Sequence, residues 1–215
     1  MTLKILFEDA HLLAVSKPSG QVVIPGRGVI PGDPLLTDVE KHTGAKMYVV
    51  HRLDRDAGGI TLFAKDAASH RGLCLQFERR EMEKTYLVAV EGRPASEGRI
   101  NQPLRAFGSG RMGVHPEGKS SLTEFRLREP LSAGAALLEV TPHTGRRHQI
   151  RVHLYFIGHP VLGDRLYGTN RPVGGVSRLM LHAWKLGFKH PDGRKLVLQD
   201  DPPEDFTAVL HPMRF

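Results

Sequence analysis

The interpretation of this chain depends on residues 51–60, HRLDRDAGGI. This stretch places Asp54 between Arg52 and Arg55, and a second carboxylate, Asp56, follows two residues later. The spacing alone is typical of a surface loop of mixed charge. A metal site fits less well, because no third hard ligand is close in the sequence and the two arginines would repel a cation. The pattern therefore identifies Asp54 as an arginine-flanked carboxylate and leaves its role open.

Apolar residues on both sides of this stretch predict an α+β fold. Period-two alternation favours strands, whereas a spacing of three and four favours helices. We expect strands at residues 4–7, 12–16, 60–64, 84–91, 121–128 and 136–141, a hairpin at 180–198, and helices at 35–42, 67–80 and 147–157. Because strands outnumber helices and many neighbours look antiparallel, we expect a mainly antiparallel sheet rather than a doubly wound parallel one.

The chain is basic, with a formal net charge of +7 and a pI of about 9.8. The charge is unevenly distributed, since residues 144–178 contain six arginines and a single acid, Asp164, whereas residues 200–215 contain four acids and one arginine. A concentrated basic region favours a polyanionic partner such as nucleic acid.

Residues 144–151, TGRRHQIR, are predicted to open the helix at 147–157. Arg147 and Arg151 are four positions apart and would share one face of that helix. A helix N-terminus attracts anions through its unpaired N–H groups and its dipole. Two interpretations stay open here: a solvated basic face, or phosphate contact combined with one arginine turned inward onto a carboxylate.

Motifs for other chemistry are missing from the sequence. It contains no dinucleotide fingerprint, no phosphate-binding loop and no nucleophile elbow, and its twelve histidines show no metal-binding spacing. The single cysteine, Cys74, cannot form an internal disulfide, which fits a reducing compartment. The first residues do not read as a signal peptide, and no apolar run approaches the roughly 18 residues of a membrane span. We therefore expect a cytoplasmic protein.

Residues 51–60 closely resemble the active-site motif of RluA-type pseudouridine synthases. Further stretches resemble the other signatures of that family and occur in the same order, namely 14–20 (AVSKPSG), 84–86 (KTY), 118–125 (GKSSLTEF), 144–153 (TGRRHQIRVH), 163–168 (GDRLYG) and 179–183 (LMLHA). One such motif would be weak evidence, but this many in order, over nearly the whole chain, is strong.

The resemblance implies a pseudouridine synthase fold with RNA-gripping loops, in which residues 1–215 form a single catalytic domain and act as a monomer. The implied reaction detaches uracil from C1′ of a uridine in structured ribosomal or transfer RNA, turns the base and rejoins it through C5. It needs neither metal nor cofactor. Asp54 matches the essential carboxylate, acting either on the sugar carbon or on a sugar proton.

Other residues take their expected roles from the same resemblance. Arg151 matches the charge partner that keeps the carboxylate ionised. Tyr86 matches the ring that stacks against the target base, and Arg52 matches the side chain that fills the space left by an extruded base. Leu181 is expected to pack under the base. Further candidates for RNA phosphate contact are Arg111 and Lys119 on the glycine-rich arm at 105–119, which would otherwise be solvated surface charges, and Arg147.

Two departures from the family pattern stand out. Ala57-Gly58 replaces the usual Thr-Ser, which removes two hydroxyls beside the aspartate. Many relatives also carry a small N-terminal S4-like RNA-binding domain, whereas here the catalytic signatures begin with the first residues.

Two rival functions use the same residues differently. A non-catalytic RNA-binding protein would not require Asp54. A glycosidic hydrolase would need two converging carboxylates, and nothing in the spacing of Asp56 makes it converge with Asp54.

Overall fold

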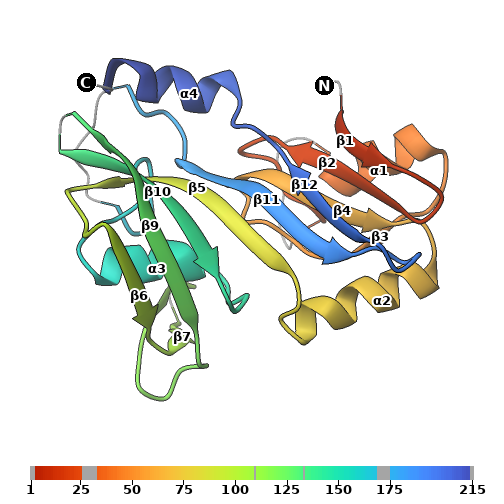
Figure 1. Cartoon of the computed structure of the whole chain (residues 1–215), viewed down its shortest axis with the longest axis horizontal. Helices are drawn as coiled ribbons and strands as arrows, with labels where there is room; N and C mark the ends of the chain where they lie inside the picture. The colour runs from red at the N-terminus through yellow and green to blue at the C-terminus, as the bar shows by residue number, and fades with distance from the viewer. Residues whose placement is uncertain (1–2, 26–32, 109, 133, 169–174, 214–215) are drawn as a thin grey trace. The chain divides into compact units, whose positions relative to one another are not determined.

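The computed structural model describes residues 3–25, 33–108, 110–132, 134–168 and 175–213. The chain divides into two compact units, and each is described by itself. The first unit consists of Met1–Glu83 with Ala183–Asp201, and the second consists of Lys84–His182 with Pro202–Phe215. Figure 1 shows the elements in chain order, from the red N-terminal strands to the blue C-terminal helix.

The first unit is a sheet covered by helices. Strands β1 (Lys4–Glu8), β2 (Leu12–Lys17), β4 (Gly58–Ala64) and β11 (Leu181–Lys189) follow one another across it; β12 (Lys195–Gln199) pairs with β11, and β3 (Tyr48–Val49) pairs with β4. Helix α1 spans Leu35–Thr43 and ends at Gly44, whose φ of 66° closes the turn. Helix α2 spans Ala67–Glu78, and its N-cap Asp66 accepts a hydrogen bond from the Ser69 N–H.

Alternation along β2 and β4 explains the two apolar layers of this unit. Leu12 and Ala14 pack with Leu73 of α2 in one buried cluster. Leu13 and Val15, which point to the opposite face, pack with the apolar side of α1 in another. Successive side chains of a strand face opposite sides, so a strand covered on both faces is apolar throughout. The loop that carries Asp54 therefore starts and ends on a sheet buried on both faces.

The second unit is an antiparallel sheet with a separate hairpin. Its strands run in the order β5 (Glu83–Glu91), β10 (Ala135–Pro142), β9 (Leu122–Leu131) and β6 (Glu97–Asn101). Strands β7 (Leu104–Ala106) and β8 (Met112–Val114) form a two-stranded hairpin, which we call the arm. Helix α3 (Gln149–Phe156) packs against β9 and β10. Helix α4 (Glu204–Leu210) and a short 3-10 turn (His211–Met213) complete the unit.

Most of the elements predicted from the sequence are confirmed, including the α+β class and the antiparallel pairing. The glycine-rich segment expected to form an arm at 105–119 contains strand β8 and most of strand β7. Strand β6 and helix α4 were not predicted, because both are short and rich in charged residues. One predicted boundary is wrong in a way that matters for the site: α3 begins at Gln149 and not at Arg147.

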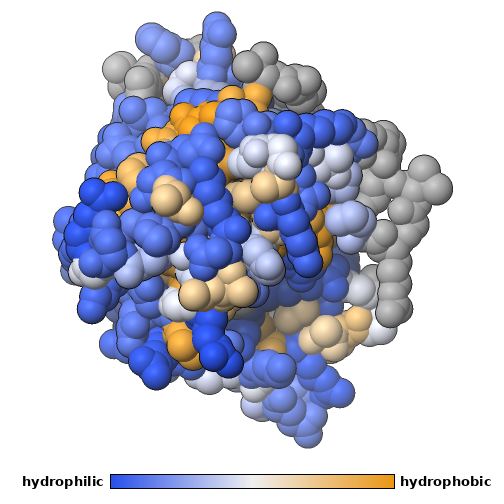
Figure 2. Space-filling view, turned by 90° about the vertical axis from the view of Figure 1, so that its right-hand side faces the viewer, coloured by the Kyte–Doolittle hydropathy of each residue, from blue (hydrophilic) through white to orange (hydrophobic). Residues whose placement is uncertain are grey.

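Figure 2 shows a face that is mostly hydrophilic, with apolar residues in small patches. Single exposed apolar residues are normal on a folded protein, and the buried clusters lie beneath such a surface. Within the described ranges, no helix is long and apolar enough to cross a membrane.

Candidate active site

Asp54 lies in the loop of the first unit that joins β3 to β4, and His51 holds the start of this loop. His51 Nε2 accepts a hydrogen bond from the Leu62 N–H of β4 at 3.1 Å. Its ring also stacks on Phe77 of α2, with 4.8 Å between the ring centroids. A ring nitrogen that accepts carries no proton, so the neutral imidazole has its proton on Nδ1. These two contacts fix the chain three residues before Asp54.

A buried lysine holds the other side of the loop. Lys17 Nζ donates to the carbonyl oxygens of Pro18, Gln21 and Arg55 at 2.8, 2.7 and 2.9 Å. Gly20 and Arg55 add a reciprocal pair, because Gly20 N–H donates to the Arg55 oxygen and Arg55 Nε donates to the Gly20 oxygen. Burying an ammonium is costly unless it is hydrogen-bonded, and the three acceptors offset that cost. The residue after Asp54 is thereby tied to the turn that follows β2.

Gly59 directly follows Ala57-Gly58, the two residues that differ from the Thr-Ser of the family pattern. No other residue could replace Gly59 without strain. Its φ is 112°, and a Cβ there would overlap the backbone of Ala183 on β11. Ala57 and Gly58 are themselves buried. A positive φ and a close backbone approach are the two conditions that require glycine. The departure at 57 and 58 thus leaves the glycine that shapes the exit of the loop in place.

Within this loop the side chains differ in exposure. Asp54 is half-buried, whereas Arg52 and Asp56 are exposed. The Ala57 N–H donates to the Asp54 carbonyl oxygen at 3.2 Å and closes a turn. The carboxylate of Asp54 is therefore presented on a loop whose backbone is hydrogen-bonded on both sides.

Arg151 of α3, in the second unit, forms a buried ion pair with Asp164. Its Nε and Nη2 donate to the two carboxylate oxygens of Asp164, both at 2.7 Å. The side chains are 3% and 0% exposed. Of the interpretations left open for residues 144–151, the arginine turned inward onto a carboxylate is therefore Arg151. Its bidentate partner lies thirteen residues further along the chain.

Asp164 is held ionised by its surroundings. Burial alone would raise the pKa of this carboxyl group, but the hydrogen bonds and charge of Arg151 and the N–H groups of Leu166 and Tyr167 outweigh it, and the pKa lies below its ordinary value. Tyr167 also lies against the guanidinium, with Arg151 Cζ 5.2 Å from its ring centroid. The plane of Arg151 is thereby fixed by a carboxylate and an aromatic ring.

The expectation that Arg147 and Arg151 share a helix face is wrong. The residue before the helix, His148, has a φ of 54°, so the regular helix cannot extend back to Arg147. Arg147 is exposed and precedes α3, whereas Arg151 is buried within it. The two arginines therefore belong to different environments, and α3 does not present a basic stripe.

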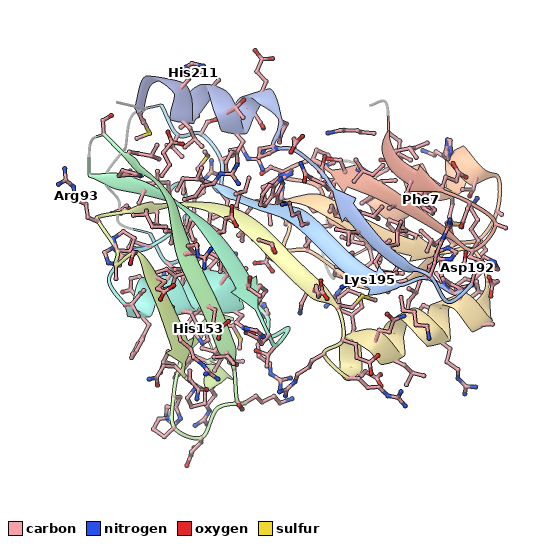
Figure 3. The ribbon with its side chains drawn as sticks, in the orientation of Figure 1. Phe7, Arg93, His153, Asp192, Lys195 and His211 are labelled. Atoms are coloured by element: carbon pink, nitrogen blue, oxygen red, sulfur yellow. The ribbon has the colours of Figure 1, made fainter. Side chains whose placement is uncertain are left out.

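Buried polar side chains from the same signature attach α3 to β9. Gln149 Nε2 donates to Thr123 Oγ1 at 3.0 Å, and His153 Nδ1 lies 2.8 Å from the same hydroxyl. His153 Nε2 lies 3.0 Å from the Gln102 carbonyl oxygen, which can only accept, so Nε2 carries the proton. Burial lowers the pKa of His153 and keeps it neutral. Figure 3 labels His153, which is a residue of α3.

The remaining predicted residues also lie in the second unit. Tyr86 is half-buried on β5 opposite Val140, and Leu181 is buried at the first position of β11. The other two, Arg111 and Lys119, are exposed on the arm and just after it, and Lys119 is bridged to Leu104 of β7 through backbone hydrogen bonds. Exposure of both cations is what contact with a phosphate backbone requires.

Sequence interpretation did not single out Lys17, Asp164 and Tyr167. Asp164 was noted only as the one acid in a segment with six arginines, and no partner was assigned to it. Lys17 ends an apolar strand, but a lysine in that position is more often solvated than buried. In the described part of the chain, no group of three or more His, Cys, Asp or Glu side chains could hold a metal ion.

Comparison with known proteins places this geometry in a family. The profile described as RNA pseudouridylate synthase matches residues 11–155. The chain is 37% identical to "Ribosomal large subunit pseudouridine synthase D" of Nitrosomonas europaea, covering 99% of this chain and 65% of that protein. It is 36% identical to "Dual-specificity RNA pseudouridine synthase RluA" of Salmonella typhimurium, covering 88% of each. It is also 36% identical to "tRNA pseudouridine synthase C" of Pasteurella multocida, covering 89% of this chain and 87% of that one.

A solved structure agrees with these sequences. "Human RNA Pseudouridylate Synthase Domain Containing 1" matches 97% of this chain and 87% of its own, with a TM-score of 0.82 and 26% identity. The predicted pseudouridine synthase fold is therefore confirmed. The chain belongs to the RNA pseudouridylate synthase family and, by that membership, is an enzyme that isomerises uridine to pseudouridine in RNA.

Proposed function

We propose that residues 1–215 act as one catalytic domain on structured ribosomal or transfer RNA, with Asp54 as the essential carboxylate. The observation that carries the assignment to Asp54 is its loop, which is anchored before it by His51 and after it by Lys17. A reacting group gains most when its position is set before the substrate arrives. The names of the relatives, which cover both ribosomal and transfer RNA synthases, support the choice of substrate class.

The reaction exchanges the glycosidic bond at N1 for one at C5, and it exchanges the hydrogen at C5 for one at N1. The bond from C1′ to N1 of uracil breaks, the base turns, and C1′ joins C5. C5 then loses its proton, and N1, which carried none in uridine, gains one. We propose that the Asp54 carboxylate acts on the sugar of the target uridine, either by attacking C1′ or by removing a sugar proton. Arg151 is proposed as the charge partner of the carboxylate, on the resemblance of its signature, and its fixed plane supports such a role.

RNA contacts are proposed for the other candidates. Tyr86 would stack on the target base, a contact worth about 1–3 kcal/mol. Arg52 is exposed and planar, which suits it to fill the gap left by a flipped base, and Leu181 would pack under that base. The exposed cations Arg111, Lys119 and Arg147 would contact phosphates.

Release of tritium from RNA labelled at C5 of uridine tests the assignment, because C5 gives up its hydrogen as the bond to C1′ forms. Unmodified large-subunit ribosomal RNA and transfer RNA transcripts serve as substrates. Asp54→Asn should abolish release while RNA affinity stays within about twofold. Asp56→Asn is the matched control, since Asp56 lies two residues away on the same turn and is exposed. Release by Asp54→Asn at the rate of the unaltered protein would overturn the assignment.

Two further proposals concern state and location. We propose that the enzyme acts as a monomer in the cytoplasm. Light scattering during size-exclusion chromatography should give the 23.9 kDa of one chain. A mass of twice that value at micromolar concentration would contradict the monomer.

A further inference from the structure

Tyr167 is the residue that links the arm to Arg151 within the second unit. Its side chain is buried and forms an apolar cluster with Leu104 of β7 and Val152 of α3, with Met112 and Val114 of β8 packed at the edge. Tyr167 thus contacts both strands of the arm and the helix that carries Arg151. No role was assigned to it from the sequence.

The hydroxyl of Tyr167 is bound to the arm. It accepts a hydrogen bond from the Met112 N–H of β8 at 2.9 Å and lies 2.8 Å from Nδ1 of His148. The hydroxyl therefore has one bond to the backbone of β8 and one to a side chain that precedes α3. Burial raises the pKa of Tyr167, so the hydroxyl keeps its proton at neutral pH. A phenylalanine at this position would lose both bonds and keep the ring.

The ring of Tyr167 contacts the guanidinium groups of two arginines. Arg151 Cζ lies 5.2 Å from its centroid, and Arg111 Cζ, from the arm, lies 5.7 Å from it. Arg151 is buried, so its contact with the ring is a desolvated cation–π interaction, the stronger kind. Asp164 binds Nε and Nη2 of the guanidinium, and the ring of Tyr167 lies beside the same group. A residue without a ring would free the guanidinium to tilt about its bonds to Asp164.

We propose that Tyr167 is a positioning residue with two separable actions: its hydroxyl holds the RNA-gripping arm, and its ring holds the guanidinium of Arg151. The inference rests on the proposed function, in which the arm contacts RNA and Arg151 supports the carboxylate. It predicts that loss of the hydroxyl weakens RNA binding, whereas loss of the ring also slows the chemical step.

A tyrosine that merely filled the core would behave differently. Removing its hydroxyl would lower stability and leave RNA affinity unchanged, and removing its ring would reduce active protein without changing the rate of the folded fraction. Affinity and saturating rate must therefore be measured separately, on protein whose thermal unfolding shows that it is folded at the assay temperature.

The experiment compares Tyr167→Phe, Tyr167→Leu and Tyr155→Phe in the full chain. Tyr155 is the matched control: its ring lies 6.3 Å from that of Tyr167, but it is 53% exposed and its hydroxyl has no hydrogen bond to a described residue. Affinity is measured by filter binding of the two unmodified transcripts at several salt concentrations. The saturating rate is measured in a single turnover by tritium release.

Tyr167→Phe should raise the Kd for RNA by about 2- to 12-fold, the equilibrium worth of one such hydrogen bond. It should also reduce the slope of log Kd against log salt by about 1–2, because the arm carries Arg111 and leads into Lys119. Its saturating rate should fall by less than twofold. Tyr167→Leu should show the same change in affinity and lose up to about 30-fold in saturating rate, as loss of a desolvated cation–π contact allows. Tyr155→Phe should match the unaltered protein.

An unchanged Kd and salt slope in folded Tyr167→Phe would overturn the action of the hydroxyl. An unchanged saturating rate in folded Tyr167→Leu would overturn that of the ring. If Tyr167→Leu does not fold, Tyr167→Met, which also removes the ring, takes its place; an unchanged saturating rate in that folded variant would overturn the action of the ring. Failure of the unaltered protein to release tritium from either transcript would instead count against the proposed function, while the binding measurements would still decide the action of the hydroxyl.

Discussion

Replacing Asp164 by alanine removes the bidentate partner of a guanidinium that is only 3% exposed. Breaking a buried ion pair by deleting one member costs about 3–5 kcal/mol, since the other charge stays out of water. Asp164→Asn should cost about 1–3 kcal/mol, because its remaining oxygen still accepts from Arg151 Nη2 and from the Leu166 and Tyr167 N–H groups, whereas its NH2 group cannot accept from Arg151 Nε. The free energy of unfolding at pH 7, from urea titration followed by circular dichroism, measures both.

The same pair sets a dependence on pH. The pKa of Asp164 is lower in the folded protein than its ordinary value of 3.8, so the pair stabilises the fold at all pH values above that value. The contribution is lost as the pH falls from there through the folded pKa. Asp164→Ala should therefore differ from the unaltered protein by its full amount at pH 7 and by progressively less below pH 3.8.

An exposed ion pair serves as the control for Asp164→Ala, and a double variant tests whether the unpaired buried charge causes the loss of stability. Glu83 and Lys195 lie 2.8 Å apart but are 66% and 67% exposed, so Glu83→Ala should cost less than about 1 kcal/mol. Arg151→Met combined with Asp164→Ala should recover at least half of the loss, because no buried charge is left without its partner. A cost below about 1 kcal/mol for Asp164→Ala, or additive losses in the double variant, would refute the reasoning.

Three further outcomes follow from the described contacts. His51→Phe keeps the stacking on Phe77 but removes the acceptor for a backbone N–H, so it should lower the free energy of unfolding by about 1–3 kcal/mol, and His51→Gln should lower it less in the same urea titration. Gly59→Ala should prevent recovery of folded protein, because its Cβ would overlap the backbone of Ala183. Gly72 lies in the interior of α2 with open space around it, so Gly72→Ala should raise the free energy of unfolding by about 0.5–1 kcal/mol. Equal effects in the two variants would contradict the steric argument. Because burial lowers the pKa of His153, stability should fall as the pH drops below the ordinary value of 6.5, and His153→Gln should flatten that decline between pH 7 and pH 5.

Local patterns were sufficient to predict most of the fold. The alternation in β2 and β4, the spacing in α2 and the glycine after α1 each express a preference of a few neighbouring residues, so they can be read without knowing distant partners. The start of α3 was misjudged because nothing in the local sequence marks Arg147 and His148 as lying outside the helix. His148 adopts a positive φ and lies against Tyr167, nineteen positions away.

The sequence by itself determined the family, since its signatures occur in order over nearly the whole chain, and it determined which carboxylate stands between two arginines. Only the tertiary structure decided what surrounds those residues. In the folded chain, Lys17 is buried against the loop of Asp54, Arg151 forms an ion pair with Asp164, and Tyr167 lies between Arg151 and the arm. The physical reason is that a charged side chain is buried only where distant segments supply its partners, and those partners have no fixed spacing in the sequence.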